Sequence, residues 1–129
     1  MTRIEEPPTT SLLAAVSNAM VALHKEQFGR GPTMARSHFA GTDALVCVLQ
    51  DVLLPAERKL VDKGDHQRVR ESRAAFQVAT SDEFIGAVEA LVGRKVRAFP
   101  SATDVVENIV FEDFLFEPGS AAEPQTGSA

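Results

Sequence analysis

The chain contains no tryptophan, no tyrosine and only one cysteine, and it has no apolar run long enough to cross a membrane. A single cysteine excludes a disulfide within the chain, which points to a reducing compartment and a cytoplasmic location. The net charge of −5 argues against general nucleic-acid binding, which needs a phosphate-neutralising surface. We therefore expect a soluble protein with no direct membrane insertion and no nucleic-acid partner.

Catalytic and metal-binding patterns are also missing from the sequence. It contains no GxSxG, HExxH, CxxC, GxxxxGK[ST] or GxGxxG motif. His24, His38 and His66 belong to different segments, and we expect each to be a surface or edge residue. Cys47 lies in the apolar run ALVCVL and is expected to be an unreactive core thiol. We predict no enzymatic activity, no metal and no cofactor.

The 129 residues fit a single domain with unstructured ends. Residues 1–9 include two prolines, two glutamates and no apolar repeat, and residues 118–129 are rich in proline, glycine, serine and alanine. Such segments cannot bury enough apolar surface to offset the entropy lost on ordering. We predict one domain over residues 10–117, between a disordered N-terminus and a disordered C-terminal tail.

Periodicity and turn residues predict seven elements in the order α-β-β-α-α-β-β. The predicted helices cover residues 10–28, 55–63 and 66–92, and the predicted strands cover residues 34–39, 44–49, 95–99 and 106–116. Residues 100–104 are predicted to form the second hairpin turn. On the long third helix, the expected buried stripe consists of Val69, Phe76, Thr80, Phe84, Val88 and Leu91. The fold class is α+β, with a four-stranded, mainly antiparallel sheet and helices packed on one face.

The strand ALVCVL at residues 44–49 is apolar at every position rather than at alternate ones. A strand of this kind is covered on both faces, either inside its own fold or by a second subunit. With helices on one face only, the other face of the sheet must find cover. We therefore predict a homodimer.

A positively charged corner follows the first helix and carries the candidate ligand or partner contacts. It consists of Gly29, Arg30, Gly31 and Pro32, with Arg36 four residues further on. One interpretation is an anion site in which arginines hold bicarbonate, a nucleotide or a carboxylate. The other is a helix cap and a loop with a solvated Arg30, because the carbonyl end of a helix repels anions.

Arg73 falls in the middle of the apolar stripe of the long third helix. A charged group there needs a partner or a route to water. We favour a structural ion pair, with Glu57 as one candidate acid, over a contact to a ligand or a second subunit.

Four segments together resemble the MpsC-like family: LHKEQFGRGPTMAR (residues 23–36), LLPAERKLVDKG (53–64), RESRAAF (70–76) and VEALVGRKVRAF (88–99). The resemblance covers residues 11–118, and Gly29, Arg30, Gly31, Pro32, Arg36, Pro55, Glu57, Arg73 and Gly93 carry the family-like marks. It implies the small soluble component of a sodium-translocating, membrane-potential-generating system, whose membrane components relate to inorganic carbon uptake. We expect a non-catalytic accessory protein with a membrane transport protein as its partner. The alternative is a sensor of small anions or nucleotides built on the arginine corner.

Overall fold

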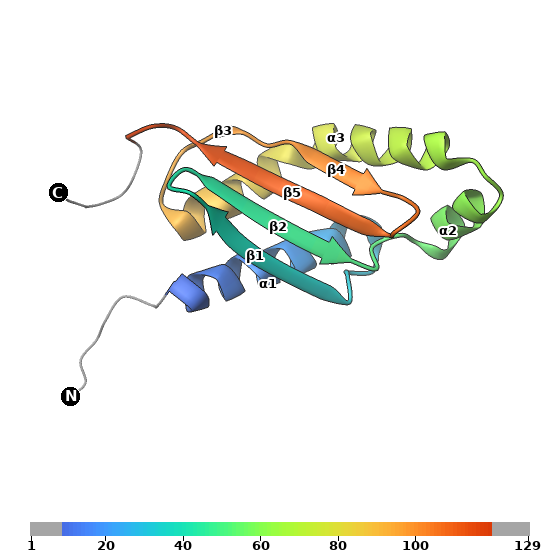
Figure 1. The fold of residues 1–129 in the computed structure, drawn as a ribbon, viewed down its shortest axis with the longest axis horizontal. Coiled ribbons are helices and arrows are strands. Elements are labelled where there is room, and N and C mark those ends of the chain that lie inside the picture. The colour runs from blue at the N-terminus through green and yellow to red at the C-terminus, as the bar shows by residue number, and fades with distance from the viewer. Residues whose placement is uncertain (1–8, 120–129) are drawn as a thin grey trace.

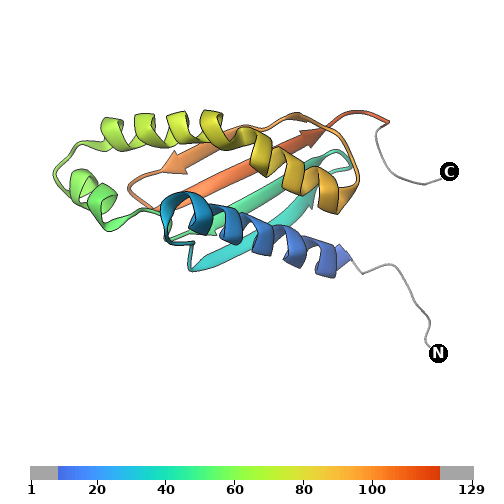
Figure 2. The same cartoon turned by 180° about the vertical axis from the view of Figure 1, so that it is seen from behind.

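The computed structural model describes residues 9–119, which form helices on one face of an antiparallel sheet (Figures 1 and 2). The helices are α1 (Thr9–Phe28), α2 (Pro55–Asp62) and α3 (His66–Val92), and the strands are β1 (Met34–Ala40), β2 (Ala44–Gln50), β3 (Val96–Ala98), β4 (Ser101–Asp104) and β5 (Ile109–Phe116). Helices α1 and α3 lie across the same face, while α2 sits beyond one end of the sheet. The predicted α+β class and helical face are confirmed.

The last strand, β5, lies inside the sheet. It pairs with β2 on one side and with both β3 and β4 on the other, so the strand order is β1-β2-β5 followed by a divided edge. The sheet therefore has five strands rather than the four predicted. The edge divides around Pro100, because proline has no N–H to donate to a strand ladder. Its carbonyl still accepts a hydrogen bond of 3.0 Å from the backbone N–H of Asp113.

The predicted turn at residues 100–104 was wrong, because Ser101–Asp104 is strand β4 and the chain reverses at residues 105–108. The Asp104 carboxylate accepts hydrogen bonds from the backbone N–H groups of Val106 and Glu107, at 3.1 and 3.0 Å. Asn108 closes the turn with a positive φ of 61°, which asparagine tolerates better than most residues.

The β1–β2 hairpin turns through residues 41–43, so Ser37 lies opposite Cys47 and Arg36 lies opposite Val48. This register matters because a shift of one residue reverses the face of every side chain. Here Ser37 and Cys47 point into the core, whereas Arg36 points away from the helices. Gly41, with a φ of 74°, supplies the left-handed residue of the turn.

The core lies between the helices and the inward side chains of β2 and β5. Its largest fully buried members are Phe114, Phe116, Met20, Leu45, Leu49 and Leu53. On α3, Val69, Phe84 and Val88 are buried as predicted, but Phe76 and Leu91 are 43% and 39% exposed. The helix therefore buries a narrower stripe than predicted.

The other face of the sheet carries no helix in the described part of the chain (Figure 1). We call it the open face, and on β1, β2 and β5 it consists of Met34, Arg36, His38, Ala40, Ala44, Val46, Val48, Gln50, Ile109, Phe111, Asp113 and Leu115. Ala102 and Asp104 of β4 continue it beyond β5. The predicted two-sided apolar character of residues 44–49 arises here, because Leu45, Cys47 and Leu49 face the helices while Val46 and Val48 face outward.

The predicted disordered ends lie almost entirely outside the described residues. Three positions of those segments are described: Thr9 is the first residue of α1, and Pro118 and Gly119 follow β5 as a turn.

Candidate functional site

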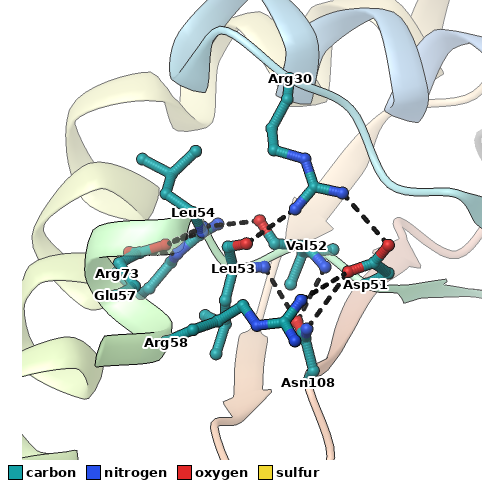
Figure 3. Close-up of polar contacts among 9 residues, drawn as sticks. All are labelled: Arg30, Asp51, Val52, Leu53, Leu54, Glu57, Arg58, Arg73 and Asn108. Carbon is teal, nitrogen blue, oxygen red and sulfur yellow. Dashed lines mark hydrogen bonds and ion pairs between the residues drawn. The ribbon is translucent and has the colours of Figure 1, made fainter. Parts of the chain in front are cut away.

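The loop that joins β2 to α2 is held by side chains from three other segments (Figure 3). The Asn108 side-chain oxygen accepts hydrogen bonds from the backbone N–H groups of Val52 and Leu53, at 2.8 and 2.9 Å. The backbone N–H of Asp51 donates to the Asn108 carbonyl at 2.9 Å, and Asp51 has a positive φ of 60°. The turn before β5 therefore fixes the exit from β2.

The predicted arginine corner binds this same loop (Figure 3). Arg30 Nη1 donates to the carbonyl of Leu53 at 2.8 Å, and Arg30 Nη2 donates to the Asp51 carboxylate at 3.1 Å. Gly29 ends α1 in the left-handed conformation at a φ of 84°. An added Cβ on Gly31 would lie 3.1 Å from both Val21 Cγ1 and the Val21 carbonyl oxygen. The corner thus packs closely on α1, and Arg30 already has partners within the fold.

Arg73 and Glu57 form the ion pair that the sequence favours (Figure 3). Arg73 Nε and Nη2 donate to the two Glu57 carboxylate oxygens at 2.9 and 2.6 Å, and Nη2 also donates to the Val52 carbonyl at 3.0 Å. The guanidinium carbon lies 4.0 Å from the centre of the Phe28 ring, a cation–π contact. Glu57 also accepts the backbone N–H of Leu54 at 2.8 Å, which caps the start of α2.

Of the predicted contact residues, the structure brings Arg30, Glu57 and Arg73 to one loop and separates Arg36 from them. Arg36 is exposed on the open face of β1, on the opposite side of the sheet from Arg73. The four positions therefore do not converge on one anion, because two of the three arginines bind the protein's own carbonyl and carboxylate groups. Pro32 is buried.

A small cavity of about 30 Å³ lies between the helices and the sheet, next to Arg73. On its wall, His24 Nε2 is 2.8 Å from Glu112 Oε2, and both side chains are buried. Two buried polar atoms of wall residues, Arg73 Nη1 and Glu112 Oε1, have no hydrogen-bond partner in the described part of the chain. Phe28, Phe76, Phe84 and Phe99 complete the apolar part of the wall.

The predicted surface position of His24 was wrong, because this residue is 4% exposed. A signal was present in the sequence: His24 lies four residues after Met20 and four before Phe28, so it shares their helix face. Its partner Glu112 could not be found this way, because 88 residues separate the two side chains.

Cys47 is buried in β2, where the hydroxyl of Ser37 donates to its sulfur at 3.4 Å. Burial raises the pKa of the thiol from 9.0 to about 11, and the Ser37 hydrogen bond opposes this only in part. The thiol is therefore protonated at neutral pH and shielded from reagents. Over residues 9–119, no group of three or more histidine, cysteine, aspartate or glutamate side chains could hold a metal ion.

These observations define a small two-layer α+β protein whose buried charges hold its own β2–α2 loop and whose sheet has one open face. The family model described as Na+-translocating membrane potential-generating system (MpsC) matches residues 9–117. The chain belongs to this family, and the resemblance in the sequence is confirmed. A search of curated proteins and a search of solved structures found no match. None of the helices within residues 9–119 is long and apolar enough to span a bilayer.

Proposed function

We propose that the chain is a non-catalytic accessory protein of a Na+-translocating, membrane-potential-generating system, and that it acts in the cytoplasm as a homodimer. The family description supports the link to sodium and membrane potential. The contacts of Arg30, Glu57 and Arg73 support a structural role for the corner, because these groups are bonded within the fold. Such a protein would act by binding other proteins, including a membrane transport component, rather than by chemistry of its own.

The open face is the observation that carries this proposal. Val46, Val48, Ile109, Phe111 and Leu115 form an apolar group on it, and no described helix lies over them. Phe111 is 43% exposed, whereas Val48 is 6% exposed because its neighbours on the face cover it. An antiparallel sheet exposed on one side normally alternates apolar residues with polar ones on the solvent side. Apolar residues on both sides of β2 instead favour a protein-binding surface.

The test is an affinity purification of the tagged full chain from native membranes in mild detergent. We expect a membrane transport subunit to be recovered in a fixed ratio, and to be lost from Val46→Glu on the open face. Val78→Glu is the matched control, since Val78 lies on α3 and is 73% exposed. Recovery of the chain alone would count against the accessory role, and equal recovery with both variants would count against a contribution of the open face to this assembly.

A cellular measurement separates the sodium role from binding as such. Deletion of the chain should reduce the Na+-dependent part of the membrane potential, measured with a potential-sensitive dye, and the wild-type chain should restore it. An unchanged potential in the deletion strain would contradict the accessory role, whatever the purification recovers.

A second candidate function, a small-ligand sensor, is favoured by one specific observation. Arg73 Nη1 and Glu112 Oε1 are buried without partners among the described residues, and both residues line one cavity, so a ligand that bonds them there would need both a hydrogen-bond acceptor and a donor. Bicarbonate has both, and the cavity limits the ligand to a few atoms. We therefore place the sensor site at this cavity rather than at the arginine corner.

A thermal-shift series with sodium bicarbonate against sodium chloride tests the sensor. A specific ligand raises the melting temperature with increasing concentration. The shift should disappear in Glu112→Gln and persist in Arg30→Ala and Arg36→Ala. The absence of a bicarbonate-specific shift would rule out this candidate. Loss of the shift in the Arg30 and Arg36 variants would instead indicate a site at the arginine corner.

A further inference from the structure

The open face arranges its side chains in rows that cross the sheet from β1 through β2 to β5. The central rows are His38–Val46–Asp113 and Arg36–Val48–Phe111, and the outer rows are Met34–Gln50–Ile109 and Ala40–Ala44–Leu115. Arg36 and His38 thus lie on β1, Ala44, Val46 and Val48 line β2, and β5 carries Asp113 among large apolar groups. The face has a basic side and an acidic side with an apolar stripe between them.

We propose that this face binds the same face of a second copy of the chain, about a two-fold axis that runs parallel to β2. The inference rests on the homodimer proposed above, and it adds the contact surface, the symmetry axis and the pairs of residues that meet. Two sheets packed face to face lie about 10 Å apart with their strands within about 30° of each other.

Rotation about an axis above β2 and parallel to it places β1 over the partner's β5. Each row keeps its position along the strands, so it lies over the same row of the partner. His38 then lies over the partner's Asp113, and Arg36 lies over the partner's Phe111. Val46 and Val48 meet their own copies at the centre of the contact. The first pair places a histidine ring, which can donate a hydrogen bond, over a carboxylate, and the second places a guanidinium on an aromatic ring, which attracts cations.

The alternative face-to-face axis runs across the strands and gives an unfavourable arrangement. It would place β1 over the partner's β1 and β5 over the partner's β5. Arg36 and His38 would then face a second basic side, and Asp113 would face a second acidic side. Like charges brought together at an interface oppose association, so the charge pattern selects the axis parallel to β2.

A charge exchange between two variants tests the axis and the contact together. Variant A carries Arg36→Glu and His38→Glu, so its β1 side is acidic, and variant B carries Asp113→Lys, so its β5 side is basic. Each variant alone opposes like charges twice, and we expect at least a tenfold rise in the dimer dissociation constant by light scattering and sedimentation. In a mixture, both contacts of the A–B heterodimer pair opposite charges, so dimerisation should recover.

Native mass spectrometry of the mixture should show the A–B heterodimer well above the half of all dimers expected from random pairing. Circular dichroism of each variant checks that it folds, and Val78→Glu on α3 controls for surface acidity. A wild-type chain that stays monomeric at about 100 µM would overturn the proposal. So would dimers of A and B as tight as the wild type, or folded variants whose mixture stays monomeric.

The same samples separate this inference from the accessory function. A monomeric wild-type chain that still recovers the membrane subunit would remove the dimer and leave the accessory role. A dimer that responds to the charge exchange but recovers no membrane subunit would support the dimer and remove the accessory role.

Discussion

Replacing Glu57 with alanine should destabilise the protein by about 3–5 kcal/mol, because it leaves a buried guanidinium without its counter-ion. Arg73 is 6% exposed and loses two of its three hydrogen bonds, those of 2.9 and 2.6 Å to Glu57. The Leu54 N–H at the start of α2 loses its acceptor in the same step. A domain of this size is typically stable by about 5–15 kcal/mol, so the change removes a large share.

Urea unfolding followed by far-UV circular dichroism measures this loss, since the chain has no tryptophan or tyrosine to report by fluorescence. The protein concentration must be held constant, because dimerisation adds to apparent stability. Arg58→Ala is the matched control on the same helix. Arg58 is mostly exposed and 3.7 Å from Asp51, so its removal should cost less than about 1 kcal/mol.

A second substitution tests the cause. Adding Arg73→Met to Glu57→Ala removes the uncompensated charge and should restore at least half of the lost stability. This explanation is refuted if Glu57→Ala lowers the unfolding free energy no more than Arg58→Ala does. It is also refuted if the loss in the double variant equals the sum of the losses in the single variants Glu57→Ala and Arg73→Met.

Three further predictions concern other parts of the fold. Gly31→Ala should destabilise the protein by about 1–3 kcal/mol, because the added Cβ would lie 3.1 Å from Val21. Gly86→Ala should stabilise it by about 0.5–1 kcal/mol, because Gly86 lies on α3 with open space around it. Urea unfolding of both variants checks the two signs. Burial, and to a lesser extent Glu112, raises the pKa of Asp113 above its ordinary 3.8, so folding opposes its ionisation. In dilute monomer, the unfolding free energy should therefore fall as pH rises from 3.8 through the raised pKa, and Asp113→Asn should remove this fall; a wild-type pH profile in the variant would disprove it. Cys47, with a pKa raised to about 11, should react with iodoacetamide at neutral pH only as fast as the protein opens, so rapid labelling of the folded state would contradict an unreactive thiol.

The features predictable from the sequence are those set by neighbours along the chain. Helical periodicity and the stop at Gly29 locate α1, and the apolar run at residues 44–49 with the glycine turn before it locates the first hairpin. The position of Arg73 within an apolar stripe was enough to infer a buried ion pair, because such a charge has few alternatives. Glu57 was a natural candidate, only 16 residues away.

The rest depends on contacts between distant segments. Asn108 falls within the predicted strand 106–116, and only the pairing of β5 with β2 brings it, as a turn residue, to Val52 and Leu53. The segment around Pro100 has the composition of a turn, yet pairing with β5 extends residues 101–104 into a strand. In both places, strand pairing between distant segments overrides the local propensity of the sequence. Such pairing cannot be read from neighbouring residues, and this limits inference from sequence.

The position of β5 has a consequence for the order of events during synthesis. Ribosomes deliver the chain from its N-terminus, so helices α1, α2 and α3 and the first hairpin emerge before β5, the strand that joins the two halves of the sheet. Until residue 116 has been synthesised, the edge of β2 that pairs with β5 has unpaired amide and carbonyl groups next to an exposed apolar surface. This interval is when the nascent polypeptide is most exposed to aggregation and most in need of a chaperone.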